Sequence, residues 1–176
     1  KRAKAELLDY VNQTYKAGLK EDVLTIGFAR RAATYKRADL LLTDIERLLE
    51  IGSGKVQFIY AGKAHPKDNA GKELIQRVVQ GGKKLGKEIP VVYLEEYNMD
   101  IGAMLTSGCD VWLNNPLPPF EASGTSGMKA ILNGVIQLST YDGWIPEAAE
   151  KNIGRIFGYR SPEGVIGDER DLKIQE

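Results

Sequence analysis

Hydrophobic positions along the chain alternate between helical spacing and short continuous runs. Leu7, Leu8 and Val11 recur at helical spacing, which predicts an amphipathic helix over residues 1–16 that ends before Gly18. The next apolar segment, 23–29, is short and continuous. Such a run is typical of a strand buried on both faces.

The same alternation continues along the chain. We expect further strands at 56–61, 91–94, 111–113, 135–138 and 155–158, and helices at 38–51, 69–79, 98–105 and 128–132. Strands and helices in this rhythm form βαβ units, which predict an α/β fold with a Rossmann-like parallel sheet and helices on both faces. Repeats, low-complexity tracts and linkers are absent, so we expect residues 1–176 to form a single domain. Ligands of such sheets bind at the carboxyl ends of the strands.

The most distinctive segment is the run EASGTSGMK at 121–129. Its small residues 124–127 precede a helix-like segment, and such a loop can present backbone N–H groups to an anion, typically a phosphate. Glu121 before the loop can accept hydrogen bonds from a polyol, and Lys129 after it can form a Schiff base. Most glycine- and serine-rich turns are only turns, and most lysines lie on the surface. The combination nevertheless predicts a phosphate-bearing cofactor beside a sugar.

A second candidate is the group of cations that follows the predicted strand 23–29: Arg30, Arg31, Lys36 and Arg37. The whole chain has 24 basic and 24 acidic residues, so a general nucleic-acid or membrane-surface role has no support and any basic feature is local. Arginine can hold two phosphate oxygens at once, and lysine supplies a mobile point charge. The alternative is a solvated basic helix start. The position at the carboxyl end of a strand favours an anion site.

Other residues with chemical potential have simpler interpretations. Tyr97 can hydrogen-bond a cofactor, but spacing alone favours an ordinary half-buried aromatic residue. The only histidine, His65, cannot build a metal site alone, and a loop role is favoured. The only cysteine, Cys109, is expected to be a small buried residue and is compatible with a reducing cytosol. Trp112 and Trp144 are expected in the core or in a pocket wall. We expect no signal peptide, and no apolar run in the sequence reaches bilayer length.

Taken together, these motifs resemble the C-terminal domain of the α-glucan (glycogen, starch and maltodextrin) phosphorylase family. The resemblance extends roughly over 22–159 and is carried by 121–129 with Asn133-Gly134, by Arg30-Arg31, by Tyr35-Lys36-Arg37, by Leu94-Glu95 with Tyr97, and by Asp142-Gly143. It implies the second Rossmann-like half of a GT-B fold. It also implies reversible phosphorolysis of α-1,4-glucan by inorganic phosphate, which yields glucose 1-phosphate with retention. The implied parent is cytoplasmic and homo-oligomeric, without a nucleic-acid or membrane partner.

The resemblance also implies roles for individual residues. Lys129 would hold pyridoxal 5′-phosphate as a Schiff base, and the other cofactor-binding positions would be Arg30, Lys36, Tyr97, Thr125, Ser126 and Gly127. Glucosyl hydroxyls would be bound by Glu121, Ser123 and Gly124, and the substrate phosphate by the catalytic residues Arg31 and Lys36; no metal is implied. In this family the cofactor phosphate takes part in proton transfer. Two phosphates held close together repel, so their proton affinities rise and become coupled.

Two departures from the family pattern fall in the site. Arg30 stands where many longer members have lysine, and Ser126-Gly127 replaces the Gly-Asn of animal-type enzymes. The charge and the small residues are retained, but arginine and lysine differ in geometry.

The first residue is Lys1, and a helical pattern follows at once, so we expect a fragment of a longer protein that lacks the family's N-terminal domain. Alone, the fragment is expected to bind the cofactor weakly and to have little or no activity. Two other functions stay open at this point. A nucleotide-sugar glycosyltransferase of the glycogen synthase type shares the architecture but does not need Lys129. A non-catalytic sugar- or phosphate-binding module would turn over no glucan.

Overall fold

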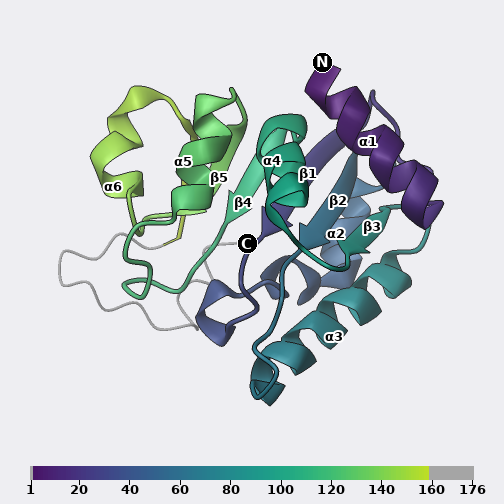
Figure 1. Ribbon diagram of the computed structural model, residues 1–176, viewed down its shortest axis with the longest axis horizontal. Helices are drawn as coiled ribbons and strands as arrows, with labels where there is room; N and C mark the ends of the chain where they lie inside the picture. Colours follow the sequence, from purple (N-terminus) through teal and green to yellow (C-terminus); the bar gives the residue numbers. More distant parts are fainter. Residues whose placement is uncertain (1, 159–176) are drawn as a thin grey trace.

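The computed structural model describes residues 2–158, which build one six-stranded sheet in the order β3-β2-β1-β4-β5-β6 (Figure 1). Every neighbouring pair of strands is parallel. The strands are β1 (Leu24–Ala29), β2 (Val56–Ala61), β3 (Val91–Leu94), β4 (Val111–Asn114), β5 (Ile136–Thr140) and β6 (Gly154–Phe157). The order reverses between β1 and β4, and a reversal of this kind opens a crevice outside the carboxyl ends of the strands. The predicted Rossmann-like α/β fold is confirmed.

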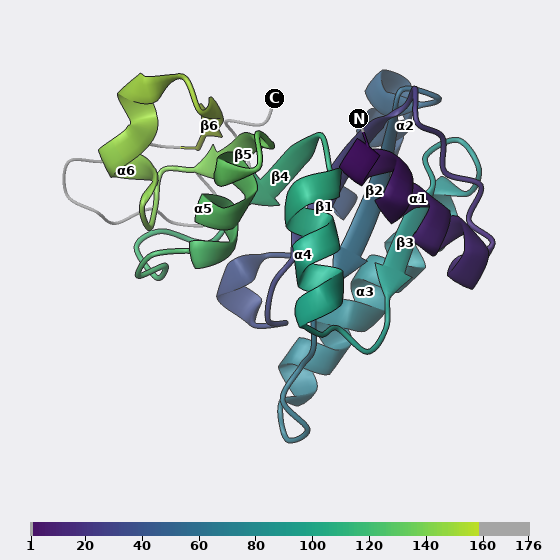
Figure 2. The same cartoon turned by 45° about the horizontal axis from the view of Figure 1, so that its top comes forward.

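Helices cover both faces of the sheet (Figures 1 and 2). They are α1 (Arg2–Tyr15), α2 (Ile45–Gly52), α3 (Asn69–Leu85), α4 (Met99–Gly108), α5 (Thr125–Leu132) and α6 (Ile145–Ala148), with 3₁₀ turns η1 (Thr34–Lys36), η2 (Leu40–Leu42) and η3 (Ala149–Lys151). Buried side chains of α1, α4 and α5 form one core with Ile59 and Trp112, whereas α3 packs on Phe58 and Leu113. Neighbouring strand residues thus point to opposite faces. Within 2–158 no helix combines the length and apolarity needed to cross a bilayer.

Close packing of β1 against the end of α4 depends on Gly27. A Cβ at this position would lie 2.4 Å from Sγ of Cys109. Cys109 is 5% exposed, and burial raises the pKa of its thiol to about 12. The expectation that this cysteine is a small buried residue is confirmed.

Several element boundaries differ from the predicted ones, and three of these differences have a clear physical reason. The helix expected at 38–51 is split, because the side chain of Asp44 accepts a hydrogen bond from the Arg47 N–H (2.8 Å) and caps α2 after the turn η2. The helix expected to end at 79 runs on through Gly81-Gly82 to Leu85. A Cβ on Gly82 would lie 2.9 Å from Cβ of Val91, so glycine lets α3 approach β3 closely. The α5 helix begins at Thr125, inside the expected loop. Residues 159–176, part of the expected single domain, lie outside the described residues.

Candidate functional site

The loops after β1 and β4 are joined by buried hydrogen bonds. The guanidinium of Arg37 donates from Nε to the Asn115 carbonyl (3.0 Å) and from Nη2 to the Pro116 carbonyl (3.1 Å). In return, the side-chain amide of Asn115 donates to the Arg37 carbonyl (2.9 Å). The Leu117 N–H donates to the Tyr35 carbonyl (2.7 Å). These hydrogen bonds hold the two loops side by side at the carboxyl edge of the sheet.

Two cations from the first loop meet one carboxylate from the second. Nη2 of Arg30 and Nζ of Lys36 both contact Oε2 of Glu121. The three side chains are 5%, 7% and 8% exposed, in that order. Charges buried to this degree are costly unless they are paired. Burial lowers the pKa of Arg30, and the Glu121 carboxylate opposes this shift. The expected cluster is therefore a buried charged site and not a solvated helix start.

One guanidinium nitrogen in this cluster has no partner. Nη1 of Arg30 is buried and makes no hydrogen bond to any residue within 2–158. A buried N–H group without an acceptor costs free energy, so an incoming oxygen ligand would be favoured here. A phosphate oxygen is a suitable acceptor for such a donor.

The loop before α5 has the geometry of an anion cradle. Gly124 precedes the helix with φ of 85°, a left-handed conformation that suits glycine. The Gly127 N–H bends back to the Gly124 carbonyl (3.0 Å), and Thr125 and Ser126 form the first turn of the helix. Free N–H groups at a helix N-terminus attract anions.

Gly127 lies against two buried polar atoms. A Cβ at Gly127 would lie 3.0 Å from Oε1 of Gln137 and 3.1 Å from Nε1 of Trp144. Neither atom has a hydrogen-bond partner in the described part of the chain. Trp144 therefore forms a wall beneath the cradle, whereas Trp112 lies fully inside the core. Any larger residue at Gly127 would press on this wall.

The Lys129 side chain is exposed and lies one helical turn beyond Thr125, which is also exposed. Residues four positions apart share one face of a helix. The amine and the start of the cradle therefore lie on the same open side of α5, while Gly127 and Ala130 are buried. Lys129 itself stays outside the buried Arg30–Lys36–Glu121 cluster.

The remaining predicted residues take different positions relative to this cluster. Arg31 is exposed next to buried Arg30. The Ser123 carbonyl accepts a hydrogen bond from the Trp144 N–H (2.9 Å). Tyr97 is half-buried, and burial raises its pKa. Its hydroxyl packs against α4, because a Cβ added to Gly102 would lie 2.7 Å from it. The structure does not bring Tyr97 to the cluster. His65 lies in an exposed loop, where Nδ1 accepts from the Lys67 N–H (3.2 Å).

Three polar residues around the cluster take structural roles that the sequence did not indicate, and one of them, Arg37, was expected among the cations of the anion site. Arg37 and Asn115 join the two loops, and both are buried. Asp142 follows β5 and accepts a hydrogen bond from the Glu121 N–H (2.9 Å). Its position in the sequence could have indicated this contact, because Asp142 follows β5, the strand next to β4.

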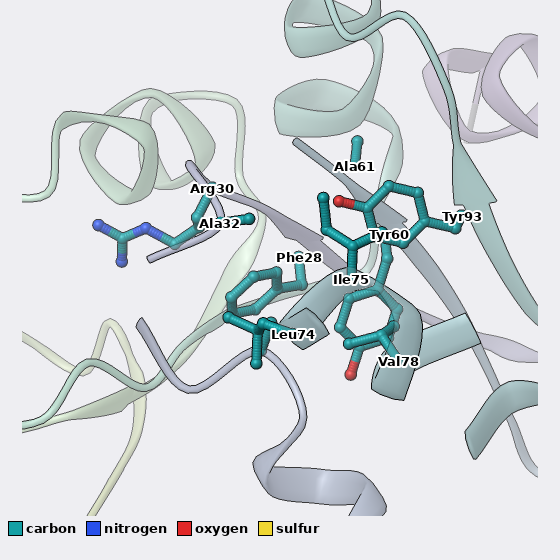
Figure 3. Close-up of a pocket in the computed structure, with 10 residues that line it drawn as sticks. Phe28, Arg30, Ala32, Tyr60, Ala61, Leu74, Ile75, Val78 and Tyr93 are labelled. Atoms are coloured by element: carbon teal, nitrogen blue, oxygen red, sulfur yellow. The ribbon is translucent and has the colours of Figure 1, made fainter. Parts of the chain in front are cut away.

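The cavity in Figure 3 is separate from this site. It lies between the sheet and α3, has a volume of about 10 Å³ and has mainly apolar walls. The Arg30 side chain borders it, but the guanidinium points away from the other lining residues (Figure 3). A volume of this size holds about one water molecule. A wider groove of about 390 Å³ lies between α3 and the edge strand β3, away from β1. Arg30 borders the small cavity, but neither Lys36 nor Glu121 lines the cavity or the groove.

Comparison with known proteins identifies a family. A sequence model described as carbohydrate phosphorylase matches residues 1–170. Glycogen phosphorylase of Aquifex aeolicus is 49% identical over 149 residues, which are 83% of this chain and 22% of the relative. Maltodextrin phosphorylase of Thermococcus litoralis is 49% identical over 155 residues, 86% of this chain and 17% of the relative. Glycogen phosphorylase of Mycobacterium tuberculosis is 46% identical over 152 residues, which are 85% of this chain and 17% of the relative.

The chain thus spans about a fifth of the length of these relatives, 22% in one case and 17% in the other two. The match covers both loops of the cluster and the cradle. It favours the resemblance drawn from the motifs over a glycosyltransferase of the glycogen synthase type. The chain belongs to the carbohydrate phosphorylase family.

Proposed function

We propose that this chain is the C-terminal, cofactor-binding catalytic domain of an α-glucan phosphorylase. The reaction would be phosphorolysis of α-1,4-glucan, which releases glucose 1-phosphate with retention. The observation that carries the proposal is the meeting of Arg30 and Lys36 with Glu121 beside the α5 cradle. The site combines cations for phosphate with a carboxylate for sugar hydroxyls. The relatives named as glycogen and maltodextrin phosphorylases support it.

The residues fit pyridoxal 5′-phosphate. The N–H groups at the start of α5 and the unpartnered Nη1 of Arg30 suit its phosphate. Lys129 on the open side of the same helix suits its aldehyde. Gly127, where a Cβ would contact Gln137 and Trp144, lets the start of α5 pack closely against these two side chains. When bound, the cofactor supplies a phosphate that can exchange a proton with the substrate phosphate.

The side chains of this chain would hold the substrate. Exposed Arg31 and the Lys36 ammonium would bind the substrate phosphate and offset the repulsion between two dianions. Nζ of Lys36 lies 4.6 Å from the centre of the Tyr35 ring, which helps to keep the ammonium in place. Glu121, Ser123 and Gly124 would orient the glucosyl hydroxyls. A fixed orientation of the reacting groups lowers the entropic part of the barrier.

We further propose that the active site is completed by a longer parent protein. The relatives are about five times longer than the matched segment, which leaves room for a domain that forms the opposite wall of the cleft. The isolated chain would then show little phosphorolysis and weak cofactor binding. The resemblance also leads us to propose a cytoplasmic, homo-oligomeric parent without membrane or nucleic-acid partners.

The proposal is tested with the full-length parent, reconstituted with pyridoxal 5′-phosphate and supplied with maltodextrin and inorganic phosphate. We expect release of glucose 1-phosphate and the absorbance of a lysine-bound cofactor. Lys129→Ala should abolish both. Lys84→Ala, which alters an exposed lysine at the end of α3, is the matched control and should change neither. Glucose 1-phosphate release by a cofactor-free parent would contradict the proposal.

A further inference from the structure

The turn after β5 lies against the loop that carries Glu121. The carboxylate of Asp142 accepts two backbone hydrogen bonds, from the Glu121 N–H to Oδ2 (2.9 Å) and from the Gly143 N–H to Oδ1 (2.8 Å). The Trp144 N–H donates to the Ser123 carbonyl (2.9 Å). Residues 142–144 therefore hold residues 121–123 through backbone atoms on both sides.

The contact between the two segments leaves no space for a side chain. Gly143 has φ of 61°, and a Cβ there would lie 2.4 Å from the Ser123 carbonyl oxygen and 3.1 Å from Cγ of Glu121. A displacement of the 142–144 turn would consequently move both the backbone and the side chain of Glu121.

Asp142 is 7% exposed, so a simple surface turn does not describe it. Within 2–158 it forms no ion pair with Arg30 or Lys36, whose contacts go to Glu121. Burial raises the pKa of Asp142, while its two backbone hydrogen bonds oppose the shift. Asp142 lies close enough to Arg30 and Lys36 to interact with their charges, but its hydrogen bonds go to the backbone N–H groups of Glu121 and Gly143.

We propose that Asp142 is a positioning residue for Glu121, holding its backbone so that its carboxylate points into the crevice at the substrate hydroxyls. This rests on the proposed function, because Glu121 must bind the glucosyl group. An aspartate suits the task since two carboxylate oxygens accept two N–H donors at once. An asparagine offers one carbonyl oxygen and turns an NH₂ group towards the second donor.

The test is a double-mutant cycle in the reconstituted full-length parent, with Asp142→Asn, Glu121→Gln and the double variant. The measured quantity is kcat/KM for glucan synthesis from glucose 1-phosphate. We expect Asp142→Asn to lower it by up to about 10²-fold, the usual scale for a misplaced catalytic geometry. The double variant should be no worse than Glu121→Gln alone, because Asp142 acts through Glu121. Losses that multiply would overturn the proposal.

A second readout separates positioning from a general structural effect. Deoxy analogues of glucose 1-phosphate lack single hydroxyls, and the wild type should discriminate against the analogue that lacks the hydroxyl bound by Glu121. Asp142→Asn should lose the same discrimination as Glu121→Gln. Where Asp142→Asn folds poorly, Asp142→Ser keeps one acceptor and should show the same loss. Either variant with wild-type discrimination overturns the proposal.

The two levels of the proposal fail in different ways. A wild-type parent that forms no glucan from glucose 1-phosphate overturns the proposed function, and the role of Asp142 falls with it. An active parent whose Asp142 and Glu121 effects are independent overturns only the role of Asp142. Cofactor absorbance and the thermal unfolding midpoint of each variant show that folded protein is compared.

Discussion

Lys36 and Glu121 lie 85 positions apart in the chain, and Nζ of Lys36 contacts Oε2 of Glu121 in the crevice between β1 and β4. Arg30 reaches the same oxygen. The cations that would bind phosphate thus have an internal counter-ion, and that counter-ion is the carboxylate that would bind sugar. An anion that binds these cations must compete with Glu121.

This competition predicts the effect of removing the charge of Glu121. Glu121→Gln should bind inorganic phosphate more tightly in the cofactor-free parent, by roughly tenfold or about 1.4 kcal/mol. Isothermal titration calorimetry measures the affinity. Glu73→Gln, which alters an exposed carboxylate on α3, should leave it unchanged. An affinity that is equal or weaker in Glu121→Gln would show that Glu121 does not compete with anions.

Gly127 should control cofactor affinity. Gly127→Ala places a methyl group 3.0 Å from Oε1 of Gln137 and 3.1 Å from Nε1 of Trp144, so either these side chains or the start of α5 must move. We expect pyridoxal 5′-phosphate to bind at least about tenfold more weakly, a loss of about 1.4 kcal/mol. Ser126→Ala keeps the backbone N–H and should have a smaller effect. Titration of cofactor absorbance measures both variants, and equal affinities would argue against a backbone cradle.

Arg37 should be a stability residue. Its guanidinium donates to the buried carbonyls of Asn115 and Pro116, so Arg37→Ala leaves both without these donors. We expect the free energy of unfolding to fall by about 3 kcal/mol, as measured by denaturant titration of the full-length parent. Arg47→Ala removes an exposed ion pair with Glu50 and should cost less than about 1 kcal/mol. Similar losses of unfolding free energy in the two variants would contradict a stabilising role for the hydrogen bonds that join the two loops.

Burial of Cys109 predicts a pH dependence. Its pKa is raised from 9.0 to about 12, mainly by desolvation, so the folded state favours the protonated thiol. The resulting stability is fully present below pH 9.0 and is lost as the pH rises towards about 12. The difference in unfolding free energy between wild type and Cys109→Ala should therefore shrink as the pH increases above 9.0. A difference that does not change with pH would mean that the thiol titrates normally.

The sheet and its crevice could be predicted because they depend on local patterns. Short, mainly apolar segments such as 56–61 and 91–94 give strands with the expected bounds. The cations Arg30, Arg31, Lys36 and Arg37 were placed after the strand 23–29, and the parallel sheet brings them to the same edge as the loop that follows β4. Boundaries were less predictable where tertiary packing overrides propensity, as at Gly81-Gly82 in α3.

The roles within the site were harder to predict, because they depend on contacts between distant segments. Nothing local shows that Arg37 is buried between two loops or that Asp142 accepts the Glu121 N–H. The pairing of Glu121 with Arg30 and Lys36 was equally hidden, since the expected partner of Glu121 was a sugar. Tyr97 shows the reverse case, for its motif matches the family while its ring packs on α4.

We have proposed that this chain supplies the phosphate- and cofactor-binding part of an α-glucan phosphorylase active site. The most direct test incubates the reconstituted full-length parent with maltodextrin and inorganic phosphate and follows the sugar product by NMR. We expect α-glucose 1-phosphate, formed only when pyridoxal 5′-phosphate is present and lost in Lys129→Ala. Free glucose, the β anomer or product formation without cofactor would contradict it.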